Sequence, residues 1–153
     1  ADFCKTLGAD HVINYQRENF VEWQKTQVPE GFDVIIDVVA GNYISKNIQV
    51  AALDAHIVTL AILGGRYCEN LDMAKMLMKR ITLSASTLRS RSDQYKKELV
   101  ASFWHKFALP LTTGKLMPAI DECVDWTMTN QLHEKMANNY NMGKLVLTIS
   151  STE

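Results

Sequence analysis

The chain has 153 residues, 47% of them hydrophobic, which suits one globular domain with a substantial apolar core. Its formal net charge is −1 and its sequence pI is near 6.5. Because no basic excess is present to attract phosphate backbones or anionic lipid, we expect neither nucleic acid nor a membrane as a partner.

Cysteine usage indicates a reducing environment. The three cysteines form no Cys-x-x-Cys pair and have no histidine at zinc-site spacing: they are Cys4, Cys68 and Cys123. No apolar run approaches the roughly 20 residues of a membrane helix, and the first residues lack the design of a signal peptide. We therefore expect a cytoplasmic protein with free thiols and no bound metal.

The first residues have the pattern of the end of a helix. An apolar stripe along residues 3–7 precedes Gly8, which can adopt the left-handed conformation that ends a helix. A natural domain seldom begins in this way, so we expect the chain to be the later part of a longer protein, although trimming of the first residues would leave the same pattern. A β-prone run at His11–Tyr15 and a helical stretch at Phe20–Gln27 follow.

Strands and helices then alternate. The run Asp33–Ala40 is almost wholly β-branched and apolar, which predicts a strand covered on both faces by helices and hence a parallel sheet. A helix at about Tyr43–Leu53, a strand at His56–Leu63, a helix around Leu71–Lys79 and a strand at Ile81–Ser86 follow. This order predicts an α/β fold, a doubly wound parallel sheet with flanking helices and right-handed crossovers.

The last third of the chain begins with a long helix. Ser92 and Asp93 are a start signal for a helix that reaches Phe107 and that Pro110 closes. The elements expected after it are an extended piece, a helix and a final strand, at Leu116–Ile120, Gln131–Asn138 and Lys144–Ile149.

The glycines do not form a phosphate-binding motif. No Gly-x-Gly-x-x-Gly occurs, so the Rossmann fold is predicted to be incomplete, without its first strand and glycine loop. Ligands of open parallel sheets lie beyond the carboxyl ends of the strands. We therefore expect one edge to carry a binding wall made of Tyr15, Ala40, Gly41, residues 62–65 and residues 87–89.

Each of these signals also has a plainer interpretation. Gly64 and Gly65 could bring a ligand close to the backbone or form a simple turn. Tyr15 could stack on an adenine or cap the core. Arg89 and Arg91 could bind phosphate or carboxylate groups of a ligand or face solvent.

Titratable residues give no catalytic constellation. Asp33 and Asp37, four residues apart on a strand, lie about 13 Å from each other and cannot share a proton. No nucleophile motif is present, and the histidines fall on different expected elements, so the catalytic residues stay unassigned.

Five segments resemble, in order and spacing, the zinc-independent quinone oxidoreductases of the medium-chain dehydrogenase/reductase family, the reductases related to zeta-crystallin. The segments are LGADHVINY, DVIIDVVAG, HIVTLAILGG, KRITLSASTLRSRS and NMGKLVL. The resemblance covers nearly the whole chain, and TLRSR followed by a helix with a tyrosine is its most specific part. It implies that residues 1–153 are part of a nucleotide-binding domain whose parent also has a catalytic amino-terminal domain.

The resemblance also implies a reaction. Such enzymes pass hydride from NADPH, with NADH possible, to a quinone or activated alkene, and this chain would be inactive alone. Relatives commonly form homodimers by joining sheet edges, here at Ile81–Ser86. Two alternatives stay open: a non-catalytic nucleotide-binding or dimerisation module, and another doubly wound protein such as a methyltransferase or short-chain dehydrogenase.

By position, the resemblance implies ten cofactor-binding residues. They are Tyr15 near the adenosine end, Gly41 near the ribose, Ile62, Leu63, Gly64 and Gly65 along the cofactor, Leu88 and Arg89 near the nicotinamide, and Asn141 and Gly143 in a closing loop.

Overall fold

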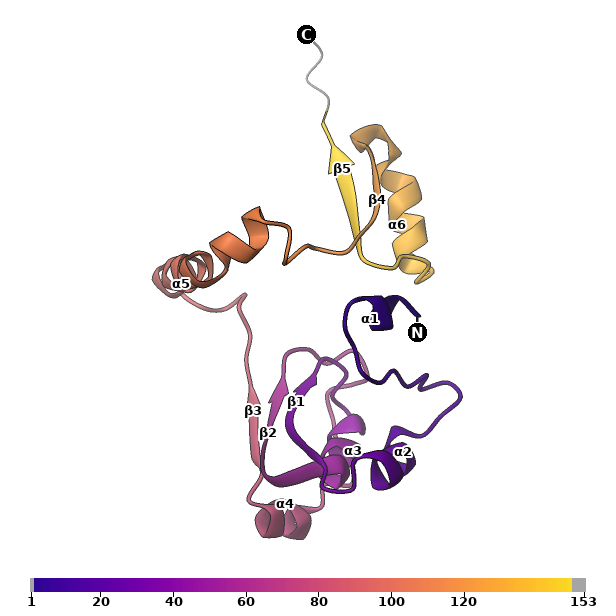
Figure 1. Ribbon diagram of the computed structural model, residues 1–153, viewed down its shortest axis with the longest axis vertical. Helices are drawn as coiled ribbons and strands as arrows, with labels where there is room; N and C mark the ends of the chain where they lie inside the picture. The colour runs from indigo at the N-terminus through magenta and orange to yellow at the C-terminus, as the bar shows by residue number, and fades with distance from the viewer. Residues whose placement is uncertain (1, 150–153) are drawn as a thin grey trace. The chain divides into compact units, whose positions relative to one another are not determined.

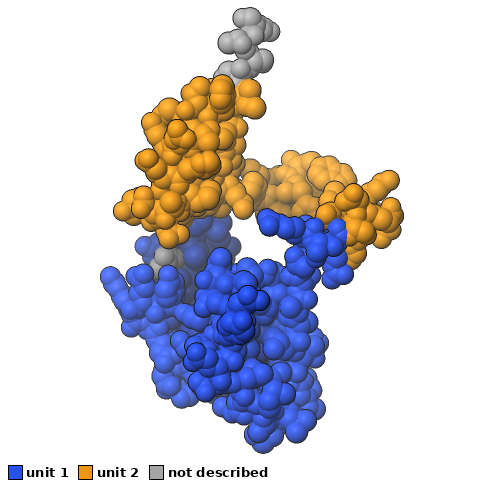
Figure 2. All heavy atoms as spheres, turned by 180° about the vertical axis from the view of Figure 1, so that it is seen from behind, with its two compact units in different colours: residues 1–91 blue, residues 92–153 orange. Residues whose placement is uncertain are grey.

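The computed structural model describes residues 2–149, which fall into two compact units (Figure 1). Unit 1 comprises residues 1–91 and unit 2 residues 92–153, as Figure 2 shows in colour. The strands before residue 92 pair in one sheet, and the described strands after it pair in a second sheet.

Unit 1 is a three-stranded parallel sheet with helices between its strands (Figure 1). The strand order is β1-β2-β3, which confirms the predicted α/β fold. The elements are α1 (Asp2–Thr6), α2 (Phe20–Gln27), β1 (Phe32–Asp37), α3 (Tyr43–Val50), β2 (Ala51–Thr59), α4 (Met73–Lys79) and β3 (Thr82–Ala85).

The register aligns the carboxyl ends of the three strands. Asp37 at the end of β1 pairs with Thr59 at the end of β2, which in turn pairs with Ala85 at the end of β3. The loops that follow the strands therefore all start at one edge of the sheet, where ligands of such folds are bound.

The core of unit 1 lies between α3 and the sheet. Ile48 of α3 and Ala55 and Ile57 of β2 are completely buried, with 0% of their surface exposed. Met76 of α4 and Ile81 pack against this cluster. Burial of one such large aliphatic side chain contributes roughly 1.5–3 kcal/mol, so this cluster is a main source of the stability of unit 1.

The two faces of the sheet differ within unit 1. Side chains alternate along a strand, and on β1 Val34 and Ile36 point away from the core, with 64% and 69% of their surface exposed. Within this unit, α3 and α4 contact β2 on the core side, and α2 packs on α3.

Three boundaries of the first two predicted strands were wrong by several residues. β1 ends at Asp37, before Ala40, because the Asp37 carboxylate accepts hydrogen bonds from the amides of Val39 and Ala40 and turns the chain. β2 begins at Ala51, immediately after α3, and ends at Thr59, before its predicted end. The residues after Thr59 leave the sheet to bond the loop that follows β1.

The segment His11–Tyr15 is not a strand. Its apolar, β-prone residues have the right composition, but the described sheet contains no strand beside β1 other than β2. The segment ends in a turn, where the amides of Arg17 and Glu18 donate to the carbonyl oxygen of Asn14. Without a partner strand, local propensity did not produce a strand.

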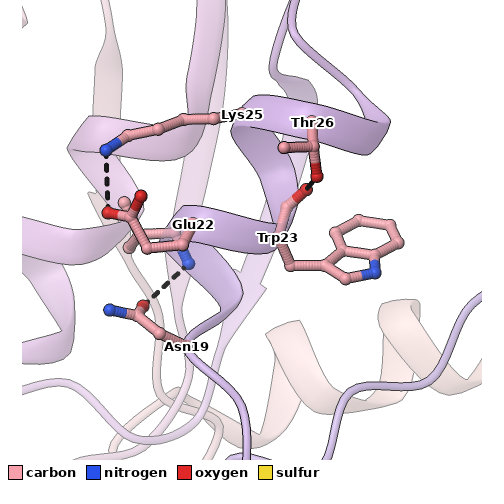
Figure 3. Close-up of polar contacts among 6 residues, drawn as sticks. Asn19, Glu22, Trp23, Lys25 and Thr26 are labelled. Atoms are coloured by element: carbon pink, nitrogen blue, oxygen red, sulfur yellow. Dashed lines mark hydrogen bonds and ion pairs between the residues drawn. The ribbon is translucent and has the colours of Figure 1, made fainter.

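Helix α2 spans the predicted residues, and its start has a local cause. The side chain of Asn19 accepts a hydrogen bond from the Val21 amide at 3.0 Å, which satisfies a donor at the helix start (Figure 3). An ion pair of 2.7 Å joins Glu22 and Lys25 one turn later. Because both side chains are exposed, that pair contributes at most about 1 kcal/mol to stability. The Asn19 cap is therefore the clearer sequence indication of where the helix starts.

Unit 2 holds a long helix and a small parallel sheet of two strands. Its elements are α5 (Asp93–Thr112), β4 (Ile120–Asp125), a 3-10 turn η1 (Trp126–Met128), α6 (Thr129–Ala137) and β5 (Lys144–Thr148). As predicted, the Ser92 side chain caps α5, accepting from the Tyr95 amide.

Two predictions in this unit were wrong. Helix α5 passes Pro110 and ends at Thr112 because a proline in the last turn sacrifices only one hydrogen bond, and the Thr112 hydroxyl donates back to the Ala108 carbonyl oxygen. The extended piece expected at Leu116–Ile120 is instead the strand β4, which starts at Ile120.

A cluster of charges joins β4 to α6. The Lys135 ammonium lies 2.6 Å from a carboxylate oxygen of Asp121 and 2.8 Å from one of Glu122. The bond to Lys135 lowers the pKa of Asp121, and the bonds to Asp121 and Glu122 raise the pKa of Lys135. Hydrogen-bonded charges therefore contribute to the attachment of α6 to its sheet.

Among residues 2–149, none of the helices combines the length and the apolar character that crossing a bilayer requires.

Candidate functional site

Two loops at the carboxyl edge of the sheet in unit 1 are joined by backbone hydrogen bonds. The amide of Leu60 donates to the carbonyl oxygen of Asp37 at 2.8 Å, and that of Leu63 to Val38 at 3.3 Å. The amide of Gly64 donates to the carbonyl oxygen of Val39 at 2.7 Å. We call residues 38–41 and 60–65 the loop platform, because these bonds make one surface of two loops.

Glycine is required where the two loops touch. A Cβ atom on Gly41, whose φ is +54°, would lie 2.8 Å from the carbonyl oxygen of Gly64. A Cβ on Gly64 would lie 2.7 Å from Cγ1 of Val39. Both contacts are shorter than real Cβ atoms allow. The absence of a side chain at Gly64 thus allows the two loops to touch. The sequence analysis had considered only close approach of a ligand and a simple turn at this position.

The outer part of the platform is open and apolar. Ile62 and Leu63 expose 61% and 82% of their surface, and a Cβ atom on Gly65 would meet nothing within 4 Å. Large apolar side chains beside bare backbone suit the flat face of a ring system. The structure thus brings together five of the expected residues, which are Gly41, Ile62, Leu63, Gly64 and Gly65.

Leu88 and Arg89 lie in the loop after β3 and are exposed. The start of this loop is tied to the same edge, since the amide of Ser86 donates to the carbonyl oxygen of Thr59 at 3.1 Å. A further bond, from the Arg91 amide to the Leu88 carbonyl oxygen, makes a turn there. The third loop therefore starts at the edge that carries the platform.

Tyr15 does not follow a strand, but it lines a shallow pocket. The Tyr15 side chain is 72% exposed, and the pocket has a volume of about 270 Å³. Its wall includes the stacked rings of Phe20 and Tyr43, whose centroids lie 5.9 Å apart, and Lys46 over the Tyr43 ring. The remaining lining residues are Arg17, Glu18 and Asn19.

Asn141 and Gly143 belong to unit 2. The Asn141 side chain donates to the carbonyl oxygen of Gly143 at 3.0 Å. A Cβ atom on Gly143, whose φ is +124°, would lie 2.6 Å from the carbonyl oxygen of Ala119. This glycine is thus required by the packing of its own loop.

One residue of the edge was missed by the sequence analysis, which considered Asp37 only as a partner of Asp33. Asp37 is buried, with 5% of its surface exposed, and it anchors the first loop, whereas Asp33 is exposed. The available signal was a carboxylate that closes an apolar run shortly before a glycine, a pattern typical of a capped turn.

Metal chemistry has no evident centre among residues 2–149. No group of three or more histidine, cysteine, aspartate or glutamate side chains in this part of the chain is arranged to hold a metal ion. These residues therefore do not fit a zinc site. The platform offers a surface for positioning a ligand.

The sequence and the fold of this chain resemble those of known dehydrogenases. The sequence profile of the zinc-binding dehydrogenases matches residues 1–104. A probable quinone oxidoreductase of Leishmania amazonensis is 33% identical over 60 residues, which cover 39% of this chain and 18% of that protein.

Solved structures show the same fold. An NAD-dependent alcohol dehydrogenase is 19% identical with a TM-score of 0.71, over 97% of this chain and 40% of that one. CurA from Vibrio vulnificus, in complex with NADPH, is also 19% identical with a TM-score of 0.74, over 98% of this chain and 46% of that one. The chain thus spans less than half of each of these proteins. Because the family profile covers more than half of its residues, the chain belongs to the zinc-binding dehydrogenase family.

Proposed function

We propose that the loop platform binds the nicotinamide half of NADPH or NADH, and that the whole protein transfers hydride to a quinone or an activated alkene. The observation that carries the proposal is the platform itself, two loops at the carboxyl edge of a parallel sheet joined by the backbone hydrogen bonds of Leu63 and Gly64. The NADPH complex of CurA, a protein of the same fold, supports the choice of cofactor. The name of the Leishmania relative supports the choice of acceptor.

The donors already in use indicate which part of a dinucleotide fits. The amides of Val39, Ala40, Leu63 and Gly64 all donate within the protein. A pyrophosphate needs several such amides, and the glycine motif that usually supplies them is not in the sequence. The apolar side chains and the open Gly65 instead suit the uncharged nicotinamide riboside.

The chemistry asked of this chain is positioning. A reduced nicotinamide supplies a hydride, that is two electrons and a proton, and the reduced acceptor takes its further proton from solvent. Holding the ring against the exposed side chains of Ile62 and Leu63 would orient it toward an acceptor bound elsewhere in the protein. Because this chain spans less than half of its relatives, we propose that it is inactive alone.

Three outlying groups extend the proposal. The pocket of Tyr15 has aromatic and basic walls that suit the adenosine end of the cofactor. Leu88 and Arg89 would lie by the nicotinamide, and the loop of Asn141 and Gly143 would close on the cofactor.

We also propose a cytoplasmic location, which the three unpaired cysteines favour and which cell fractionation would test.

Titration of NADPH fluorescence with two matched variants tests the platform. Leu63→Asp places a charge on a platform side chain that is 82% exposed, and Leu77→Asp does the same on α4, where the side chain is 80% exposed. We expect weak binding by the chain, about tenfold weaker in Leu63→Asp, and unchanged in Leu77→Asp. Equal affinity in both variants would refute the proposal, as would an absence of saturable binding.

A second role is favoured by the edge of the sheet. β3 is the last strand of the described sheet, and all four of its residues are exposed. An unpaired edge invites pairing with another copy, so we propose a homodimer formed through Ile81–Ser86.

A proline substitution can block the outer edge of β3 without removing a hydrogen bond inside the sheet. Because the Ser86 amide donates inward to Thr59, alternation directs the Ala85 amide outward. Ala85→Pro should therefore give a folded monomer in light-scattering measurements, whereas Ser84→Pro, which removes an inward donor, should unfold unit 1. A dimer that survives Ala85→Pro would rule out this edge.

A further inference from the structure

The buried carboxylate of Asp37 is bound by three uncharged donors. Oδ1 accepts from the amide of Val39 at 2.7 Å and from that of Ala40 at 3.0 Å. Oδ2 accepts from the side-chain amide of Asn47 on α3 at 2.9 Å. Asn47 is itself buried, with 6% of its surface exposed. A buried network of this kind is rigid when all of its members are satisfied.

These bonds hold the first loop in a conformation that its sequence does not favour. Ala40 has a φ of +58°, in the left-handed region that alanine seldom adopts, and Gly41 follows with +54°. The bond from the Ala40 amide to Asp37 helps keep the alanine there. A residue in a sparsely populated conformation persists only where its surroundings determine it strongly.

The shape of the first loop determines the place of the second. With the amides of Val39 and Ala40 turned toward Asp37, the carbonyl oxygens of Val38 and Val39 accept from Leu63 and Gly64. No described hydrogen bond joins the Asp37 side chain to residues 60–65. Its influence on them passes through the backbone of the first loop.

We propose that Asp37 is a positioning residue of the loop platform. Its Oδ1 atom fixes the position of residues 62–65 through the first loop, and Asn47 holds the Asp37 carboxylate in place. The inference rests on the proposed function for its ligand, the nicotinamide dinucleotide. Its structural part can be measured without any ligand.

Amide hydrogen exchange of the full 153-residue chain is the first test. Asp37→Ala removes the acceptor of both amides, and we expect Leu63 and Gly64 to exchange about tenfold faster relative to the Ile57 amide in β2. Asp37→Asn retains an acceptor oxygen at Oδ1, and its new amide group can donate to Asn47 once the Asn47 side-chain amide turns its oxygen toward it. We therefore expect values within about threefold of the unaltered chain. Ile57→Val, a small truncation in the core, should accelerate exchange in the sheet without this preference for the loops.

Equal acceleration in all parts of unit 1 in Asp37→Ala would overturn the proposal, because it would show a general loss of stability. The same conclusion would follow if Asp37→Asn were as harmful as Asp37→Ala. Should Asp37→Ala fail to fold, Asn47→Ala, which removes only the bond at Oδ2, is to be examined for the same preference for Leu63 and Gly64.

NADPH titration of the same variants separates the two proposals. Loosened loops with about tenfold weaker NADPH binding in Asp37→Ala, and unchanged binding in Ile57→Val, support both. Loosened loops in a chain that never binds NADPH support the role of Asp37 in positioning the loops and refute the cofactor. Loosened loops with unchanged NADPH affinity overturn Asp37 as a positioning residue for this site.

Discussion

Different interactions stabilise the interior of each unit. Unit 1 has an apolar core in which Ile48, Ala55 and Ile57 are fully buried. Among the described residues of unit 2, Leu132 is the one buried hydrophobic side chain, and charges around Lys135 join its helix to its sheet. The loop platform lies on the unit with the firm core, which is where a site that works by positioning needs to be.

The largest effect should come from the core. Ile48→Ala should reduce the free energy of unfolding of unit 1 by about 2–5 kcal/mol, because the helix α3 would leave a cavity against β2. Urea denaturation followed by the fluorescence of Trp23, which lies in α2, measures this loss. Replacing Trp104 and Trp126 by phenylalanine leaves Trp23 as the one tryptophan probe, which reports on unit 1. In that chain, Leu132→Ala in unit 2 should not change the urea midpoint of the Trp23 transition. A loss below about 1 kcal/mol for Ile48→Ala would contradict the comparison.

The contact between the two loops should give the next effect. Gly41→Ala adds a Cβ atom that meets the backbone of Gly64, whereas Gly8→Ala, also at positive φ, meets nothing within 4 Å. An alanine at the φ of Gly8, +98°, bears at least as much backbone strain as one at the φ of Gly41, +54°, so an excess loss in Gly41→Ala reports the added contact. We expect Gly41→Ala to lose about 1–3 kcal/mol more than Gly8→Ala in the same urea experiment. Equal losses would show that the loops do not pack as described.

The charges of unit 2 should give the smallest effect, with a defined dependence on pH. Lys135 lowers the pKa of Asp121, so this stabilisation is present above the unfolded value of 3.8 and is lost as pH falls through the lowered pKa. The pKa of Lys135 is raised, so its contribution is present below 10.5 and is lost as pH rises through the raised pKa.

Lys135→Met should therefore lower the stability of unit 2 near neutral pH and flatten its decline at both extremes. Unfolding by urea at acidic, neutral and alkaline pH, followed by Trp126 in a chain where Trp23 and Trp104 are replaced by phenylalanine, measures this. An unaltered pH profile would show that the ion pairs contribute nothing.

Features with a local cause were predictable from the sequence. The bounds of α2 follow from the Asn19 cap and the helical pattern after it, and the start of α5 from Ser92. The parallel sheet followed from the apolar runs and the intervening helices. The common edge of the three loops followed from the topology, because parallel strands end on the same side.

What depends on distant partners was not predictable. His11–Tyr15 has the composition of a strand but lacks a neighbour, and β4 was missed because its acidic residues obscure the alternation. The contact of Gly41 with Gly64 joins residues far apart in the chain, so the sequence of neither segment predicts it. The turn that Asp37 caps had a local signal, whereas the hold of Asn47 on its other oxygen depends on the next helix and had none.

The most direct test of the platform as the nicotinamide site is chemical-shift mapping of the ¹⁵N-labelled chain with the two halves of the cofactor. Reduced nicotinamide mononucleotide should shift the amides of Gly41 and residues 62–65 most, and 2′,5′-ADP those around Tyr15. Shifts from the nicotinamide half that avoid the platform, or none at its highest soluble concentration, would contradict the account.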